Sequence, residues 1–173
     1  MPEHRAQTPA ECRDLESFLW HDFAAGEADW AAWVSRKMPS VPRTAAPEAW
    51  EDAASLHAAL RSLQASNNGI ACAPAGTAYE AMNRLITRLD VRPRLARDGT
   101  VQLAAEQDTG PVVLLLLSAL HLMQTGQWHR FKLCRDPNCR ASYFDASKPA
   151  AKTWCSMETC GSRDKMRRYR AKA

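Results

Sequence analysis

Four cysteines near the C-terminus have the type and spacing that suit binding of a metal ion. Four residues separate Cys134 from Cys139, four separate Cys155 from Cys160, and fifteen lie between the two pairs. A pair of thiolates a few residues apart can bind one side of an ion from a tight turn, and a second pair can complete a tetrahedron. The pattern therefore predicts one zinc ion. Because four sulfur ligands leave no position for water, the site is predicted to be structural.

Two other interpretations of these cysteines stay open. Free cysteines are among the most buried residue types, so the four could be reduced thiols in a core. Disulfides are the second alternative, but residues 1–13 are charged and lack the apolar segment of a signal peptide, so an oxidising compartment is not implied. The turn-forming residues Pro137, Asn138 and Gly161 stand where a metal-binding turn requires them, which favours zinc.

Positive charge is concentrated in the same part of the chain. Residues 131–173 hold eleven Lys or Arg and four Asp or Glu, whereas residues 1–130 hold twelve and fifteen. A basic metal-binding module on a mildly acidic body indicates an anionic partner, and nucleic acid is the default candidate. The alternative is a basic surface that serves only solubility.

The elements that must position these residues are mostly helices. Capping signals and apolar spacing predict helical segments that begin near Thr8, Trp30, Pro47 and Thr77, and a long buried helix over about 111–126. The apolar run of that last helix is shorter than the roughly 20 residues that a bilayer requires, so no membrane segment is expected.

One small β-hairpin is predicted between Arg92 and Ala104, because Asp98-Gly99 is a dipeptide of tight hairpin turns. The expected fold is therefore mainly α. A helical domain with this hairpin is expected over residues 1–130, and a metal module over 131–173.

The metal module is predicted to have a treble-clef-like order. Residues 141–145 and 153–154 bracket a polar turn, which predicts a loose hairpin between the cysteine pairs. A final helix is predicted to begin with Ser162 as its N-cap and Asp164 in its first turn. The basic residues of this helix are the predicted nucleic-acid contacts, and two residues between the ligands are further candidates: Arg163, Lys165, Arg167, Arg168 and Arg170, then Arg140 and Lys152.

The last forty or so residues resemble the CGNR zinc-finger family. The resemblance is carried by Cys134-x4-Cys139, Phe144-Asp145, Trp154-Cys155-Ser156-Met157 and Cys160-Gly161-Ser162-Arg163. Members of that family usually carry an N-terminal helical domain called ABATE, and residues 1–130 are similar to it in length and order. The resemblance implies a bacterial, DNA-binding transcription regulator that contains zinc, with the four cysteines as its ligands. A cytoplasmic location is expected.

This chain departs from the family pattern at one position. The asparagine for which the family is named is Ser162 here. A serine can cap a helix, but it lacks the amide that pairs with an adenine edge.

A second hypothesis is a zinc-stabilised protein-interaction module that does not bind DNA. Aromatic anchors suit interfaces, and Tyr143, Phe144 and Trp154 are the candidates, although we expect them to form a small core beneath the finger. An enzyme is not expected, since the sequence lacks His-x-x-x-His, a nucleophile elbow and a phosphate loop.

Two further partners are expected. A homodimer is predicted because operator-reading modules are often dimeric and one short finger binds weakly alone. A small-molecule effector in the helical domain is a hypothesis taken from the family. Four tryptophans there are otherwise expected to pack in the core: Trp20, Trp30, Trp33 and Trp50.

Overall fold

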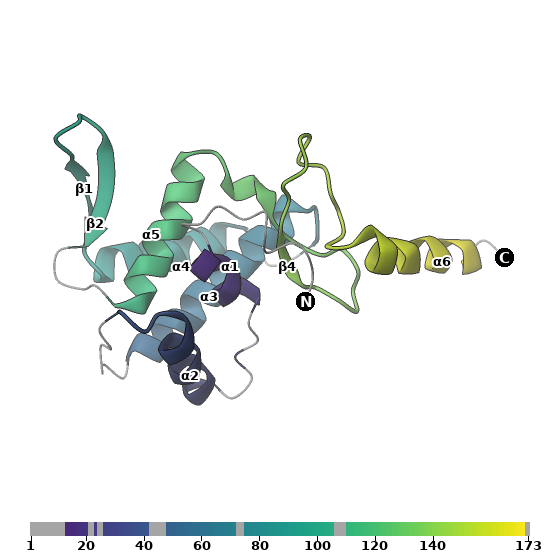
Figure 1. Ribbon diagram of the computed structural model, residues 1–173, viewed down its shortest axis with the longest axis horizontal. Helices are drawn as coiled ribbons and strands as arrows, with labels where there is room; N and C mark the ends of the chain where they lie inside the picture. Colours follow the sequence, from purple (N-terminus) through teal and green to yellow (C-terminus); the bar gives the residue numbers. More distant parts are fainter. Residues whose placement is uncertain are drawn as a thin grey trace.

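The computed structural model is mainly α-helical with two small antiparallel sheets, as the sequence predicts (Figure 1). It describes residues 13–20, 23, 26–41, 48–71, 75–105 and 110–171. The elements in chain order are α1 (Arg13–Trp20), α2 (Glu27–Lys37), α3 (Glu48–Asn67), α4 (Ala75–Arg88), β1 (Val91–Leu95), β2 (Val101–Ala105), α5 (Pro111–Gln124), the 3-10 turn η3 (Trp128–Arg130), β3 (Phe131–Leu133), β4 (Ser142–Phe144), the π-helical turn η4 (Met157–Gly161) and α6 (Ser162–Arg170).

Helix α3 organises the helical part of the molecule. It contacts α1, α2, α4, α5 and the strand β3. Its Leu56, Leu60 and Leu63 recur on one face and are at most 2% exposed. Burial of each leucine contributes about 1.5–3 kcal/mol. The same helix thus supports the other helices and the strand that leads to the first cysteine.

The long apolar run is the buried helix α5, as predicted. It begins after Gly110 with Pro111 at its first position, where the missing N–H of proline costs nothing. Leu115, Leu116 and Ala119 are at most 1% exposed. No helix of the described residues is long and apolar enough to cross a membrane.

The predicted starts of three helices have different outcomes. Thr8 and Pro47 lie outside the described residues, which show α1 from Arg13 and α3 from Glu48. Helix α4 begins at Ala75, so the prediction that Thr77 caps it is wrong. Ala75 is a strong helix former that packs against the core, and it extends the helix beyond the capping signal.

The β1–β2 hairpin forms around Asp98-Gly99, as predicted. Leu95 pairs with Val101, and the chain turns at Gly99, whose φ of +81° is costly for any other residue type. Asp98 Oδ1 accepts hydrogen bonds from the backbone N–H and the hydroxyl of Thr100. The hairpin projects from the helical body at the end opposite to α6 (Figure 1).

The second sheet connects the helical body to the cysteines. Strand β3 pairs with β4, and Phe131 lies opposite Phe144 with ring centroids 5.2 Å apart. Both rings belong to the main hydrophobic core, together with Trp128. The apolar core therefore continues past residue 130 into the metal module.

The predicted hairpin between the two cysteine pairs is wrong. Residues 145–156 form no strand, and the partner of β4 is β3, which precedes the first cysteine. The physical reason is that Phe131 and Phe144 bury their rings together in the main core, which fixes this pairing. The segment after β4 is instead held by the side chain of Asp145, which accepts hydrogen bonds from the backbone N–H groups of Ser147 and Lys152.

Candidate metal centre and basic helix

The four predicted metal ligands lie together. The Sγ atoms of Cys134, Cys139, Cys155 and Cys160 are all within 4.8 Å of one another. The Sγ–Sγ distance is 3.7 Å from Cys139 to Cys155 and 3.8 Å from Cys155 to Cys160. Zinc–sulfur bonds of about 2.3 Å in a tetrahedron give sulfur–sulfur distances of about 3.8 Å. The arrangement fits one zinc ion held by four thiolates.

The first pair of cysteines lies in a tight turn between β3 and β4. The backbone carbonyl of Asp136 accepts hydrogen bonds from the N–H of Cys139 at 3.0 Å and of Arg140 at 3.1 Å. Arg140 has a φ of +47°, which ends the turn, and the N–H of Cys134 then bonds to the carbonyl of Ala141. This turn brings both sulfur atoms to the same side of the backbone.

The second pair opens into the last helix. The side chain of Ser156 accepts a hydrogen bond from the N–H of Thr159, and its carbonyl accepts from Cys160 and Gly161. Helix α6 follows the π-helical turn η4 directly. A Cβ atom at Gly161 would come within 3.0 Å of the sulfur of Met157, so a side chain there would force a shift.

The prediction that Ser162 caps α6 is wrong. No side chain caps α6, and the hydroxyl of Ser162 donates to the carbonyl of Met157 at 3.3 Å. The capping role falls to Ser156, because the helical backbone already begins at η4. Cys160 therefore lies inside a continuous helical segment, and its sulfur is fixed relative to α6.

The electrostatics of the cluster favour a cation. The hydrogen bond from Cys155 lowers the pKa of Cys134 to about 5, and the same contact raises the pKa of Cys155. Desolvation raises the pKa of Cys160 to about 11. Neighbouring thiols thus cannot all ionise without a compensating positive charge. A divalent zinc ion supplies it and binds all four as thiolates.

The predicted nucleic-acid contacts on α6 lie on an exposed helix. None of its residues is buried, and the helix extends away from the rest of the molecule (Figure 1). Arg163, Arg167 and Arg168 have side chains that are 53%, 45% and 69% exposed. Within the described part of the chain, Lys165 and Arg170 take part in no ion pair.

Two carboxylates hold the arginines of α6 in place. Asp136, in the first cysteine turn, lies 3.1 Å from Arg163 and 3.6 Å from Arg167. Asp164 lies 2.7 Å from Arg167 and 2.8 Å from Arg168. Hydrogen bonding from Arg167 lowers the pKa of the Asp164 carboxyl group. Three of the five basic residues are therefore paired rather than free in solution.

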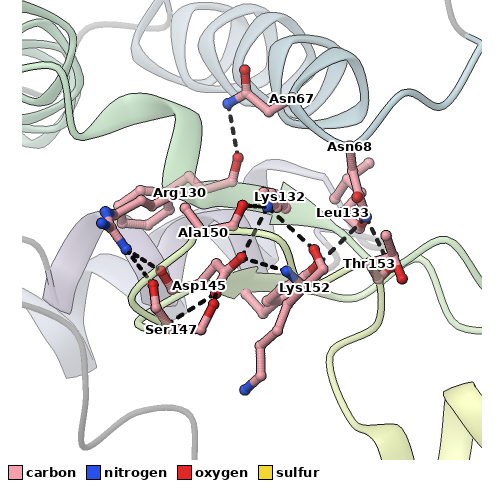
Figure 2. A network of polar contacts seen from close by, with 12 residues as sticks. Asn67, Asn68, Arg130, Lys132, Leu133, Asp145, Ser147, Ala150, Lys152 and Thr153 are labelled. Atoms are coloured by element: carbon pink, nitrogen blue, oxygen red, sulfur yellow. Dashed lines mark hydrogen bonds and ion pairs between the residues drawn. The ribbon is translucent and has the colours of Figure 1, made fainter.

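The two candidates between the ligands are in different surroundings. Arg140 has its Nη1 atom buried, without a hydrogen-bond partner among the described residues, and its carbonyl accepts from Arg61 at 3.0 Å. The backbone of Lys152 bonds to Asp145 and Tyr143, while its ammonium group points away from this network (Figure 2). Lys152 presents its charge outward, and Arg140 only in part.

A buried ion pair secures the segment between the cysteine pairs, and sequence reasoning missed it. The ammonium of Lys132 donates to Asp145 at 2.9 Å and to the carbonyls of Ala150 at 2.6 Å and Lys152 at 3.2 Å (Figure 2). Asp145 also accepts from the N–H and hydroxyl of Ser147. The Asp-x-Ser sequence after β4 is a turn signal that would have indicated part of this network.

Polar residues in the last turn of α3 and just beyond its end anchor the metal module, and these were missed as well. Asn68 donates to the carbonyls of Leu133 at 2.7 Å and Thr153 at 2.9 Å, which precede the first and the second cysteine pair respectively (Figure 2). Asn67 donates to the carbonyl of Phe131, and the side chain of Gln64 donates to Ser142 at 2.6 Å. These polar residues on a largely buried helix were the available signal.

The aromatic side chains of the module are mainly core, as expected. Tyr143 and Phe144 are 1% and 6% exposed, and Trp154 is partly buried against the cysteine cluster. In the helical part, Trp30 and Trp33 are buried and stack with centroids 5.6 Å apart. The side chain of Trp20 lies outside the described residues.

Two family models match the chain. Residues 7–126 match ABATE, described as "putative stress-induced transcription regulator", and residues 130–173 match the CGNR zinc finger. None of the curated proteins compared with the chain matched it. The resemblance inferred from the sequence is confirmed for both parts.

Proposed function

The chain belongs to the ABATE family and ends in a CGNR zinc finger that binds one zinc ion, and on this basis we propose that it regulates transcription by binding duplex DNA through α6. The proposed role is binding alone. Zinc held by four thiolates has no open position for a substrate, and it would serve to fix the start of α6.

The exposed basic surface of α6 is the observation that carries this proposal. Five of its nine residues are Lys or Arg, none is buried, and its first turn follows a zinc ligand directly. At 1.5 Å per residue the helix is about 13 Å long, and a helix of ordinary diameter fits the major groove of B-DNA. A rigidly mounted cationic helix suits the phosphate backbone.

A concave surface runs along the same helix. It has a volume of about 650 Å³ and is lined by Arg163, Arg167 and Arg170 of α6 and by Asn138 of the first cysteine turn, among others. Glu158 also lines it, so part of this surface repels phosphate. The three arginines lie one turn apart, and we expect Arg167 and Arg170 to follow the phosphates of one DNA strand.

The salt dependence of binding to a random-sequence duplex tests this proposal. If two to four phosphate contacts form, log affinity against log salt should fall with a slope of roughly −2 to −4. A K165A/R170A variant should flatten the slope by about two. The matched control is R84A/R97A, which removes the same charge from exposed positions on α4 and the β1–β2 turn. A flat slope, or equal losses in both variants, would reject DNA binding through α6.

A protein-interaction role is the second candidate, because α6 also exposes apolar side chains. Met166 and Tyr169 are 51% and 72% exposed, and Met157 before them is 62% exposed. Tyr143 and Phe144 are buried and cannot contact a partner. The candidate contact residues for this hypothesis are therefore the exposed Met166 and Tyr169 of α6. A partner retained after nuclease treatment and lost in Y169A would favour this role over DNA binding.

We propose two further partners of this regulator. One short helix makes few contacts, so a homodimer would double the DNA-binding surface. A groove of about 620 Å³ between β2 and α5, lined by Gln102, Leu103, Leu117 and His121 among others, is the candidate effector site. Sedimentation of the chain tests for the homodimer. A thermal-shift screen of metabolites, run on wild type and on L117W, tests for an effector in the groove. A monomeric mass would count against the homodimer. Absence of stabilisation by any metabolite would count against the effector site.

A further inference from the structure

Asp136 is a buried carboxylate that connects the first cysteine turn to the basic helix. Its side chain is 0% exposed. Its backbone carbonyl closes the turn through Cys139 and Arg140, and its Oδ1 accepts from the N–H of Asn138 at 3.3 Å. The position of this carboxylate is therefore set by the metal-binding turn itself.

The carboxylate of Asp136 is directed at one face of α6. Its Oδ2 accepts a hydrogen bond from Nη1 of Arg163 at 3.1 Å, and its Oδ1 lies 3.6 Å from Nη1 of Arg167. Arg163 and Arg167 are four residues apart and share a helix face. Asp136 thus acts across 27 residues of sequence, from one cysteine pair to the helix that follows the other.

The pairing leaves most of the Arg163 guanidinium available. A guanidinium has five N–H donors in one plane, and among the described residues Arg163 donates to Asp136 alone. Its side chain is 53% exposed, so the remaining donors face solvent. Asp136 therefore holds one edge of the Arg163 guanidinium, and the other edge is open to a ligand.

A fixed guanidinium suits base recognition better than phosphate binding. Phosphate contacts tolerate a mobile charge, whereas a guanine requires two coplanar donors directed at its O6 and N7 atoms. A free arginine side chain carries about 2 kcal/mol of rotamer entropy. A partner that already holds the guanidinium plane reduces the entropy that is lost on binding DNA. Lys165 and Arg170, which form no ion pair within the described part of the chain, are suited to phosphates.

We propose that Asp136 is a positioning residue that holds Arg163 for reading a guanine in the major groove of duplex DNA. This inference rests on the proposed DNA binding through α6. It adds a specificity-determining pair, Asp136 and Arg163, to a helix whose other cations contact the backbone.

The test begins with selection of a preferred site from a randomised duplex pool by the zinc-loaded full chain. Affinities are then measured for the selected duplex and for copies in which each guanine is replaced by adenine. D136N and R163K should each lower the discrimination at one guanine by roughly 5- to 100-fold, the range expected for a bidentate pair. The D136N/R163K double variant should lose little more than either single variant.

D164N is the matched control. It removes the same negative charge from a carboxylate that pairs with Arg167 and Arg168 but not with Arg163. It should change binding to random duplex as D136N does, and it should keep the discrimination at that guanine. Zinc content and circular dichroism of each variant show whether the fold is retained, and R163K keeps the test valid if D136N loses zinc.

The outcomes separate this inference from the proposed function. Full discrimination in R163K, or in a zinc-loaded D136N, would overturn the role of the pair. Salt-dependent binding of the wild type with no guanine in the selected site would overturn it too, while DNA binding would stand. Absence of any binding to duplex DNA would overturn both the role of this pair and the proposed DNA binding through α6.

Discussion

The buried pair of Lys132 and Asp145 should carry a large share of the stability of the metal module. Their side chains are 5% and 0% exposed. Replacement of Asp145 by alanine leaves a buried ammonium with only the carbonyls of Ala150 and Lys152, and it removes the acceptor for the N–H groups of Ser147 and Lys152. Removing one partner of a buried pair costs about 3–5 kcal/mol.

The charge state of Asp145 fixes the conditions of the measurement. Desolvation acts to raise its pKa, but hydrogen bonds from Ser147 and Lys132 outweigh it and hold the pKa below the ordinary 3.8. The stabilisation is therefore fully present above about pH 4 and is lost as the pH falls through the lower folded-state value. At pH 7 the carboxyl group of Asp145 is therefore ionised.

Urea denaturation at pH 7 with excess zinc, followed by circular dichroism, measures the effect. With a slope near 2 kcal/mol per molar urea, D145A should lower the midpoint by roughly 1.5–2.5 M. R168A removes the exposed partner of Asp164 and should shift the midpoint by at most about 0.3 M, because an exposed helix pair contributes about 0.3–0.5 kcal/mol.

A double-mutant cycle isolates the pair itself. K132M removes the buried ammonium, so K132M/D145A should be less destabilised than the sum of the two single variants. A midpoint for D145A within 0.3 M of wild type, or a coupling energy of zero, would refute the conclusion that this pair is buried and closely bonded.

Three other measurements probe the same structure. C155S should lose the single zinc equivalent that wild type retains, as measured by metal analysis, and zinc retained in C155S would contradict the four-ligand site. A chelator added to wild type should lower the helical signal in circular dichroism, because α6 follows a zinc ligand. N68A should cost about 1–3 kcal/mol in urea denaturation, because the carbonyls of Leu133 and Thr153 lose a buried donor, and a change below 0.5 kcal/mol would count against this anchor. G161A should bind zinc nearly as wild type does in a competition assay, because its Cβ would crowd only the end of the exposed Met157 side chain, which can move aside. G76A, where a Cβ would meet nothing within 4 Å, is the control, and a large loss of zinc affinity in G161A alone would contradict this expectation.

Local features that depend on a few neighbouring residues were predictable from the sequence. The turn at Asp98-Gly99 formed because a positive φ is a local property of the dipeptide. The apolar face of α5 likewise depends only on residue spacing. The cysteine spacing indicated zinc because ligands within a turn reach one ion through local geometry alone.

Capping and pairing in the metal module were not determined locally. Ser162 has the residue type of an N-cap, but the helical backbone had already begun at Met157, so Ser156 took that role. Strand β4 had an apparent partner after the turn at 147–149, yet it paired with β3 because Phe131 and Phe144 share the main core. Each competing arrangement was locally acceptable, and burial in the core decided between them.

Residue types and their spacing along the chain were enough to identify the chemistry that is present: four thiolates for zinc and a run of cations at the C-terminus. The contacts between these groups are visible only in three dimensions. Asp136 reaches Arg163 across 27 residues, Lys132 reaches Asp145 across 13, and Asn68 reaches Thr153 across 85. Such contacts depend on buried polar groups finding partners in three dimensions, and residue types along the chain do not specify which partner is near.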